Sequence, residues 1–468
     1  MSNSYDAIII GAGMSGLAAG IRLAMFDKKV VILEKHLIPG GLNSYYSRRI
    51  KETKEMVDLD VGLHALTNFA TKGEKGKPLT KLLKQLRIPY DDLKLKEQSY
   101  SLIQFKSASL KFSNDFELIK AEIASVFPNE IDSFVKFSHF VSTYNEVDLH
   151  APYLSARKVL DDYFQDDLIK EMIMSPLLIY GSAWEHDMDF SQFVIMFKSL
   201  YFEGFSRPVG GVRTILDLLL DKFKKLGGEL CFRTEVESIE DCGPLKKVKL
   251  SKGCGTLEAK TILSSAGIVE TKKMIKGFEN TNSSVGKLSF LETIFLVKEK
   301  KTILDFGATI VFYNKSDKYS YQKPETAYDL ESAVFCLPDN YDKDHDSKKD
   351  AVVRVTNMAN YDLWNSFDKK TYRENKEIVF QKAKELGENI LGTELTLSFK
   401  DTFSPTTIKR YTSHLGGTVY GSPDKVKNGK IGVPGIYIIG TDQGFLGIVG
   451  SMLSGISMAN LYGLMDER

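Results

Sequence analysis

Hydrophobic and polar positions change their spacing twice within the first 35 residues of the chain. The apolar run Ala7–Ile10 is long enough for a buried parallel strand, and from Leu17 to Ala24 the apolar residues recur at helical spacing. A second apolar run, Val30–Leu33, follows and ends on Glu34. This order predicts a strand, a helix and a second strand, which together make one βαβ unit.

Three glycines stand where the first predicted strand meets the helix. Gly11 permits the tight turn, Gly13 lets backbone N–H groups approach a pyrophosphate, and Gly16 lets the helix pack close to the strands. The anion would then lie at the positive end of the helix. Glu34, about 20 residues further on, can accept hydrogen bonds from ribose hydroxyls. The sequence therefore predicts a dinucleotide-binding unit, the alternative being a glycine-turn βαβ unit with an empty pocket.

A second strand, glycine turn and helix follow near the other end of the sequence. Ile436–Ile439 predicts a short buried strand, and Gly444, Gly447 and Gly450 precede a small-residue helix over Ser451–Ala459. This helix N-terminus could lie against a redox ring that gains electron density on reduction. The alternative is a strand and helix that only complete the sheet.

Between these regions the character of the chain alternates. Residues 1–70, 205–275 and 396–468 have the pattern of a dinucleotide-binding domain, whereas 71–204 and 276–395 are rich in helices with aromatics or mix strands with a helix. We expect a discontinuous cofactor domain with a substrate domain inserted into it. The aromatic residues of the second region suit either an apolar tunnel or an ordinary core.

The stretch after residue 205 predicts several elements of the cofactor domain. They are an amphipathic helix over Val212–Leu226, a strand over Glu229–Ile239, a hairpin of Leu245–Leu250 with Gly255–Ala259, and a buried strand over Thr261–Ala266. Gly227 and Gly228 would end the helix in a left-handed conformation.

The composition narrows the class of protein. The 468 residues are too many for one core, and 43% hydrophobic with 26% charged residues is ordinary for a soluble globular protein. A net charge of +1 gives no indication of a nucleic-acid partner. The four cysteines show no CxxC pair or metal-ligand spacing, so we expect free thiols, a cytoplasmic location and no metal site. No run of 18 apolar residues predicts a spanning helix, the first strand begins too early for a cleaved signal peptide, and any membrane contact would be peripheral.

One segment has a local excess of positive charge. Between Thr71 and Tyr90 there are six Lys or Arg residues and one acid, beside leucines near helical spacing. Two interpretations are open: a basic amphipathic helix that lies on an anionic bilayer, or a solvated helix that packs its leucines on the core. We favour the second.

Three blocks of the sequence resemble flavin-dependent amine oxidases and carotenoid desaturases. They are GAGMSGLAAGIRLA…VVILEK with Pro39-Gly40-Gly41-Leu42, PVGGVRTILDLLLDKFKKLGGEL with Val236, and the closing IYIIGTDQGFLGIVGSMLSGISMA. Within that superfamily the chain is most similar to the phytoene desaturase, carotenoid isomerase and retinol saturase branch. Its GxDxxxxGxxGxxxSG-like ending and the LDVGLH segment, Leu59–His64, carry this narrower match. The blocks are specific for the flavin domain and say little about the substrate domain.

The resemblance implies an α/β fold: a Rossmann-type FAD-binding domain interleaved with an α+β substrate domain, with FAD held in extended form across the sheet. By position, Gly11, Gly13 and Gly16 would hold the pyrophosphate, Glu34 would bind the ribose, and Val236 would contact the adenine. Gly41 and Leu42 would lie on the flavin side, and Asp442 with Gly450 would contact the ribityl and ring region. The other expected cofactor-binding residues are Met14, Ser15, Lys35 and Gly440.

The resemblance also implies the chemistry. A flavin carries out two-electron chemistry itself, so no Ser-His-Asp set is needed. We expect a FAD-dependent oxidoreductase, a desaturase or a saturase, that acts on a hydrophobic polyene or isoprenoid-like substrate by hydride transfer at flavin N5. Isomerisation without net redox change stays open. His64 is the candidate catalytic residue, as a proton shuttle, with a structural histidine as the alternative.

Two other polar features have open interpretations. The cluster from Tyr180 to Asp187 would line an entrance to the substrate site or form a polar loop between two helices, which we favour. Arg207 would serve either the domain hinge or a polar end of the substrate.

Other classes of protein stay as alternatives. An amine-oxidase or protoporphyrinogen-oxidase-like activity is one, but the arginine that often follows the Gly-Gly pair in amine oxidases is absent, and only two tryptophans exist. A flavin-free prenyl or lipid carrier, similar to Rab GDP-dissociation inhibitors, is another. The intact glycine set and Glu34 argue against such a carrier. The sequence predicts no oligomeric state.

Overall fold

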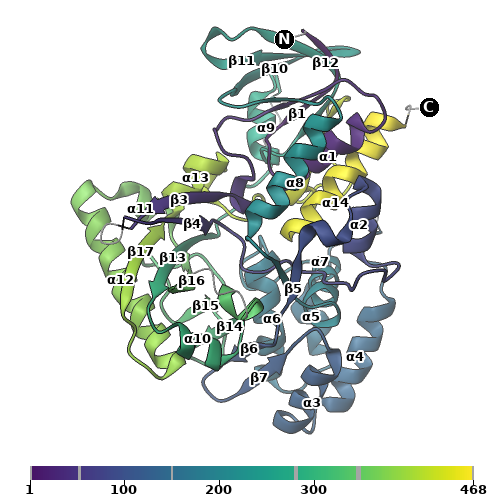
Figure 1. The fold of residues 1–468 in the computed structure, drawn as a ribbon. Helices are drawn as coiled ribbons and strands as arrows, with labels where there is room; N and C mark the ends of the chain where they lie inside the picture. Colours follow the sequence, from purple (N-terminus) through teal and green to yellow (C-terminus); the bar gives the residue numbers. More distant parts are fainter. Residues whose placement is uncertain (1–2, 51–53, 149–150, 279–282, 344–348, 466–468) are drawn as a thin grey trace.

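A computed structural model of the chain describes residues 3–50, 54–148, 151–278, 283–343 and 349–465 (Figure 1). Most of its strands lie in two seven-stranded sheets. In Figure 1 the first sheet lies at the top, the second at the lower left, and a group of helices at the lower right.

The first sheet brings together strands from the start, the middle and the end of the chain. Across the sheet they are β10 (Val236–Cys242), β11 (Leu245–Leu250), β12 (Thr256–Ser264), β1 (Ser4–Ile10), β2 (Val30–Leu33) and β9 (Glu229–Cys231), and β18 (Ile436–Ile438) pairs with the end of β12. β1 is parallel to both β2 and β12, whereas β11 is antiparallel to both of its neighbours, β10 and β12. Parallel strands of this kind are buried on both faces, which explains their unbroken apolar runs.

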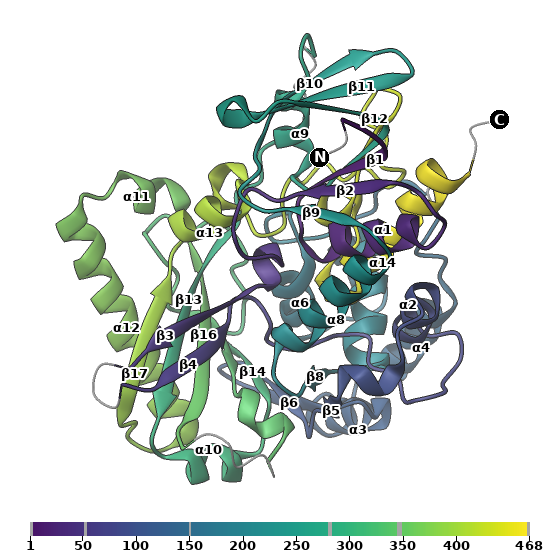
Figure 2. The same ribbon diagram turned by 45° about the horizontal axis from the view of Figure 1, so that its top comes forward.

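Helices cover one face of this sheet. They are α1 (Met14–Ala24), α8 (Val212–Lys225), α14 (Gly447–Ala459) and, packed against α14, α2 (Pro78–Leu86) (Figure 2). The helices α1 and α14 approach closely because both contain small residues: a Cβ on Gly455 would lie 2.1 Å from the carbonyl oxygen of Ser15. On the opposite face, residues of α9 (Ile268–Met274) pack against the strands.

The lysine-rich segment forms α2, and its leucines face inward. Leu79, Leu82, Leu83 and Leu86 are all buried in the core that α1, α8 and α14 share. This confirms that the leucines pack on the core. None of the described helices is long and apolar enough to cross a bilayer.

The second sheet is almost entirely antiparallel. Its order is β17 (Leu397–Phe403), β13 (Ser289–Val297), β16 (Ala351–Ala359), β15 (Ser332–Cys336), β14 (Ile310–Asn314), β6 (Ser101–Gln104) and β7 (Ser109–Phe112). Only β14 and β6 pair in parallel. Strand β17 lies in this sheet although the sequence analysis grouped residues from 396 onward with the cofactor segments; the domain boundaries themselves stay a prediction.

A helical group packs against this second sheet. It consists of α3 (Phe116–Val126), α4 (Ile131–Thr143), α5 (Ala156–Asp161), α6 (Asp167–Gly181) and α7 (Phe190–Phe197). Most of the aromatic side chains between residues 134 and 205 are buried here against one another and against the sheet. They therefore form core, and Tyr180 at the end of α6 is an exception that reaches a cavity.

Smaller elements complete the fold. They are the hairpin of β3 (Tyr45–Arg49) with β4 (Met56–Asp60), the two-stranded sheet of β5 (Leu95–Glu97) with β8 (Ser206–Pro208), and the helices α10 (Lys300–Phe306), α11 (Tyr361–Ser366), α12 (Lys369–Leu391) and α13 (Pro405–Thr412). The hairpin of β3 and β4 packs on the second sheet, where Leu59 and Ile50 join a small core with Ile294.

The structure confirms most of the elements predicted after residue 205 and corrects two. The helix and the hairpin of β11 with β12 are present. The predicted strand over Glu229–Ile239 is instead two strands, because Arg233 between them has a φ of 53° and Thr234 turns to donate its N–H to the Glu34 carbonyl. The predicted strand at Thr261 is not separate but continues β12, which pairs with β11 along its first half and with β18 along its second.

Candidate functional site: a cofactor cleft joined to an apolar chamber

A cleft of about 390 Å³ lies where the parallel strands β1 and β2 end. This is the usual position of a ligand in an open α/β sheet. The predicted cofactor residues that line it are Gly11, Gly13, Met14, Ser15, Glu34, Lys35, Gly41, Leu42, Val236 and Gly440. The structure therefore brings together residues from five separate segments, and we name this space the cofactor cleft.

The glycines of the first turn have different surroundings. Gly11 has a φ of 96°, which a residue with a side chain rarely adopts. A Cβ on Gly16 would lie 2.0 Å from the Gly11 carbonyl oxygen, so Gly16 closes the turn against the helix and does not line the cleft. A Cβ on Gly13 would meet no atom within 4 Å, and Gly13 lines the cleft. The bare backbone at Gly13 is thus the surface that a pyrophosphate needs.

Glu34 is buried at the end of β2 and holds this turn in place. Its Oε2 accepts a hydrogen bond from Ala12 N–H at 2.8 Å, and its Oε1 accepts one from His36 N–H at 2.8 Å. Each carboxylate oxygen has a second acceptor position. Because Glu34 also lines the cleft, those positions can accept hydrogen bonds from ribose hydroxyls.

Besides Gly16, two of the predicted cofactor residues, Asp442 and Gly450, do not line the cleft. The buried Asp442 carboxylate accepts from Ile268 N–H at 2.7 Å, from Ser422 N–H at 2.9 Å and from Lys425 Nζ at 3.3 Å. Burial lowers the pKa of Lys425, and Asp442 opposes that shift. The Asp442 carboxylate therefore binds two backbone N–H groups and a buried lysine, and Gly440 lines the cleft instead.

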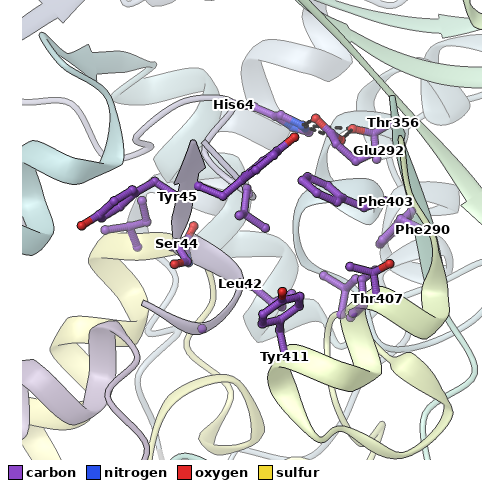
Figure 3. Close-up of a pocket in the computed structure, with 18 of the residues that line it drawn as sticks. Leu42, Ser44, Tyr45, His64, Phe290, Glu292, Thr356, Phe403, Thr407 and Tyr411 are labelled. Carbon is purple, nitrogen blue, oxygen red and sulfur yellow. Dashed lines mark hydrogen bonds and ion pairs between the residues drawn. The ribbon is translucent and has the colours of Figure 1, made fainter. Parts of the chain in front are cut away.

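A larger cavity of about 650 Å³ adjoins the cofactor cleft, and we name it the chamber. Figure 3 shows some of the residues that line it. The two spaces share the wall residues Glu34, His36, Gly41, Leu42, Asn43, Tyr411, Thr441 and Ser451. The apolar side chains that line the chamber include Ile179, Met196, Phe290, Val334, Phe403, Leu446 and Ile448. The N-terminus of α14 also lines the chamber. The helix begins at Gly447, four residues before the predicted start at Ser451, and its position against a redox ring stays a prediction.

The predicted catalytic residue His64 lies at one end of the chamber. Its Nε2 is 3.3 Å from both carboxylate oxygens of Glu292 and 3.0 Å from the Thr356 hydroxyl (Figure 3). The Thr356 hydroxyl itself donates to Glu292. All neighbours of Nε2 therefore accept from it, which assigns a proton to Nε2. On the other side of the ring, Nδ1 lies 3.5 Å from the hydroxyl of Tyr180.

A buried ion pair supports this histidine. Arg354 Nε donates to Glu292 Oε1 at 2.6 Å, and both side chains are buried. Burial raises the pKa of Glu292, but the charges of Arg354 and His64 outweigh it and lower the pKa to about 2. Glu292 and Thr356 stand opposite each other in the register of β13 and β16. Glu292 is thus an ionised carboxylate beside His64 at neutral pH.

Two arginines, Arg354 and Arg207, donate hydrogen bonds to backbone carbonyls of the LDVGLH segment. Arg354 donates to the carbonyls of Leu63 and Val61, at 2.7 and 2.5 Å. Arg207 donates to the carbonyls of Leu63 and His64, at 2.7 and 3.0 Å, and pairs with Asp60. Arg207 lines a separate cavity and not the chamber, and its contacts position this segment.

Most of the polar cluster between Tyr180 and Asp187 is a loop between α6 and α7, as favoured above, but Tyr180 belongs to α6 and lines the chamber. Glu185 pairs with Lys287, Asp187 accepts from the Ser155 hydroxyl and Arg157 N–H, and neither side chain lines the chamber.

Sequence reasoning missed Glu292, Thr356 and Arg354. A signal for two of them was present. Each of the runs Ser289–Val297 and Ala351–Ala359 is apolar except for a few polar residues, and each contains a single charged one. A lone charge in a buried strand needs a partner, and here the two charges are each other's partners.

Comparisons with known proteins agree with this geometry. Residues 9–86 match the family model of the NAD(P)-binding Rossmann-like domain. Over 98% of its length the chain is 24% identical to chloroplastic prolycopene isomerase of Daucus carota, covering 80% of that protein. It is 20% identical to all-trans-retinol 13,14-reductase of Danio rerio, over 97% of this chain and 85% of that one.

The fold has solved counterparts. Cyclohexylamine oxidase from Brevibacterium oxydans superposes with a TM-score of 0.63 at 12% identity, over 99% of this chain and all of that one. The resemblance predicted from the three sequence blocks is confirmed: the chain is similar, over nearly its whole length, to the carotenoid isomerase and retinol saturase branch of the flavin amine oxidase superfamily.

Proposed function

We propose that the protein is a FAD-dependent oxidoreductase that desaturates or saturates a hydrophobic polyene or isoprenoid-like substrate. One observation carries this proposal: the cofactor cleft adjoins the chamber, because Gly41, Leu42 and Thr441 are among the residues that line both. A molecule in the chamber would therefore touch the inner end of a dinucleotide bound in the cleft. The names of the two relatives, prolycopene isomerase and all-trans-retinol 13,14-reductase, support a polyene as the substrate.

The residues of the cleft fit FAD. Gly13 and the N-terminus of α1 would receive the pyrophosphate, Glu34 the ribose, and Gly41 with Leu42 the end that faces the chamber. When bound, FAD supplies the acceptor or donor of two electrons. The chamber contributes apolar walls that exclude water and align the substrate chain.

His64 is the residue that we expect to exchange a proton with the substrate. Its Nε2–H is engaged by Glu292 and Thr356, so the exchange would occur at Nδ1, where the Tyr180 hydroxyl is the neighbour. Desaturation requires a group that accepts a proton and saturation one that donates it, and a histidine does both near neutral pH.

The chamber suits an amine less well. An amine is cationic at neutral pH and needs a carboxylate or an aromatic cage. The inner carboxylate, Glu292, is already paired with Arg354. A flavin-free carrier is also disfavoured, because Gly11, Gly13 and Glu34 keep the geometry that a dinucleotide needs.

The absorption spectrum of the purified protein tests the proposal. Bands at about 370 and 450 nm that bleach with anaerobic dithionite would identify a flavin. Anaerobic mixing with polyenes, isoprenoids and amines then identifies the substrate class by bleaching of the band at the longer wavelength. A colourless protein that takes up no FAD would overturn the proposal in favour of the carrier, and bleaching by amines alone would favour an amine oxidase.

We also propose a cytoplasmic protein with no nucleic-acid partner. Cys242 and Cys254 are exposed free thiols, which suits a reducing compartment. Peripheral membrane contact through the lysines of α2 is a separate hypothesis that co-flotation with anionic liposomes at low salt tests; no flotation would reject it.

A further inference from the structure

The chamber opens to solvent beside a group of charged side chains that the proposed chemistry does not use. They are Arg48 on β3, Lys376 on α12, Asp401 on β17 and Arg410 on α13, all of which line the chamber, and we name them the rim. In Figure 2 these four elements gather on the same side of the molecule. Arg48 and Arg410 are exposed, whereas His64 at the inner end is largely buried.

The cations of the rim are only loosely paired. Arg48 Nε lies 3.5 Å and Lys376 Nζ 3.9 Å from the Asp401 carboxylate. Charge-assisted hydrogen bonds are shorter, at about 2.7–2.9 Å. The Asp401 carboxylate is closer to Tyr46 OH, at 3.2 Å, and to its own neighbour Thr402 N–H, at 2.8 Å. Three cations and one carboxylate leave the rim with an excess of two positive charges and with donors that can take another anion.

The other end of the chamber has no such excess. Glu292 is balanced by Arg354, and the wall between the two ends is formed largely by apolar side chains. An elongated molecule in the chamber would thus have an apolar environment along its chain and a cationic one where it leaves the protein. A plain hydrocarbon would gain nothing from the rim, whereas a molecule with an anionic end would gain from it.

We propose that the natural substrate is an apolar polyene or isoprenoid chain that carries one anionic end group, a carboxylate or a phosphate, and that Arg48 and Lys376 hold this group at the rim. This inference rests on the proposed function and names the substrate class of the same site. The anionic end fixes how far the chain enters, so the rim also selects which carbon atoms of the chain lie beside His64.

A binding titration tests the proposal on the holoprotein without turnover. The probe is parinaric acid, a fluorescent conjugated polyene acid, compared with its neutral methyl ester. We expect the acid to bind more tightly, and its advantage to shrink as salt rises from 0.05 to 0.5 M, because exposed charges are screened. Competition by an isoprenoid monophosphate against the matching alcohol distinguishes a phosphate end from a carboxylate end.

Two variants should shift the affinity for the acid in opposite directions. Arg48→Gln should weaken binding of the acid about two- to five-fold, the range for an exposed ion pair, and leave binding of the ester unchanged. Asp401→Asn should strengthen binding of the acid by a similar factor. The matched control is Arg49→Gln: Arg49 is the next residue on β3, is also exposed, points to the other side of the strand and does not line the chamber.

Equal affinities for the acid and the ester in the unaltered protein would overturn the proposal. So would equal effects of Arg48→Gln and Arg49→Gln. Loss of co-flotation with anionic vesicles in Arg48→Gln, without any preference for the acid, would assign the rim to a lipid surface instead. None of these outcomes would test the proposed function itself. The flavin spectrum and its bleaching by neutral polyenes test that function independently.

Discussion

Arg354 and Glu292 form an ion pair of 2.6 Å in the interior of the second sheet, behind His64. The same guanidinium also donates to the Leu63 carbonyl, so the pair ties the sheet to the segment that carries the histidine. A buried charge that loses its partner is far more costly than an exposed one, because no water replaces the partner. The geometry beside the proposed substrate therefore depends on this pair.

Replacing Glu292 should destabilise the protein. In Glu292→Gln the buried Arg354 keeps its charge without a counter-charge, and we expect the free energy of unfolding to fall by about 3 kcal/mol. Urea denaturation at pH 7 measures the change. The control is Glu377→Gln, which removes an exposed partner of Lys400 and should cost less than about 0.5 kcal/mol. Equal losses in the two variants would contradict the interpretation.

The same carboxylate should make stability depend on pH. The pKa of Glu292 is about 2 in the folded protein against 4.5 as the ordinary value. A lowered pKa stabilises the fold at pH values above 4.5, and this contribution, about 3 kcal/mol, is lost as pH falls from 4.5 toward 2. Urea titrations at pH 5 and pH 3 on the unaltered protein and on Glu292→Gln separate it from other acids. The variant should lose less stability between the two pH values, and an identical loss would count against the pair.

Two glycines of the first turn should respond differently to the same substitution. Gly16→Ala places a methyl group 2.0 Å from the Gly11 carbonyl oxygen, so the turn must distort and the melting temperature should fall. Gly13→Ala meets no neighbouring atom, so the protein should fold normally but bind FAD at least ten-fold more weakly. Thermal melting and FAD titration of both variants check this. Normal FAD affinity in Gly13→Ala would mean that the pyrophosphate lies elsewhere.

His64 should affect turnover and not cofactor content. We expect His64→Gln to lower kcat by about 100-fold, the contribution of a general acid or base, with FAD content unchanged. Tyr180→Phe removes the hydroxyl beside Nδ1 and should lower kcat less while shifting the pH profile. The exposed His139 on α4 supplies the control, as His139→Gln. A variant of His64 with normal kcat would leave the histidine a structural role only.

The cofactor cleft could be predicted from the sequence because its residues belong to local sequence motifs. Gly11, Gly13 and Glu34 lie within one βαβ unit, and Gly440 follows its strand directly. The inner end of the chamber could not be predicted from the sequence. His64 and Glu292 are 228 positions apart, and they meet only because of the strand register of the second sheet, which no local sequence pattern determines. For Asp442 the motif was misleading: its position in the motif predicted a cofactor contact, but its carboxylate accepts hydrogen bonds from the backbone N–H groups of Ile268 and Ser422.

The pairing of β18 with β12 has a consequence for synthesis. Gly440, Thr441 and Ser451 line the cofactor cleft next to the first turn, and a Cβ on Gly440 would lie 2.8 Å from Ser15 Oγ. During translation the first turn leaves the ribosome long before these residues are synthesised. The turn therefore offers a nucleotide only part of the cleft until α14 has emerged and β18 has paired with β12.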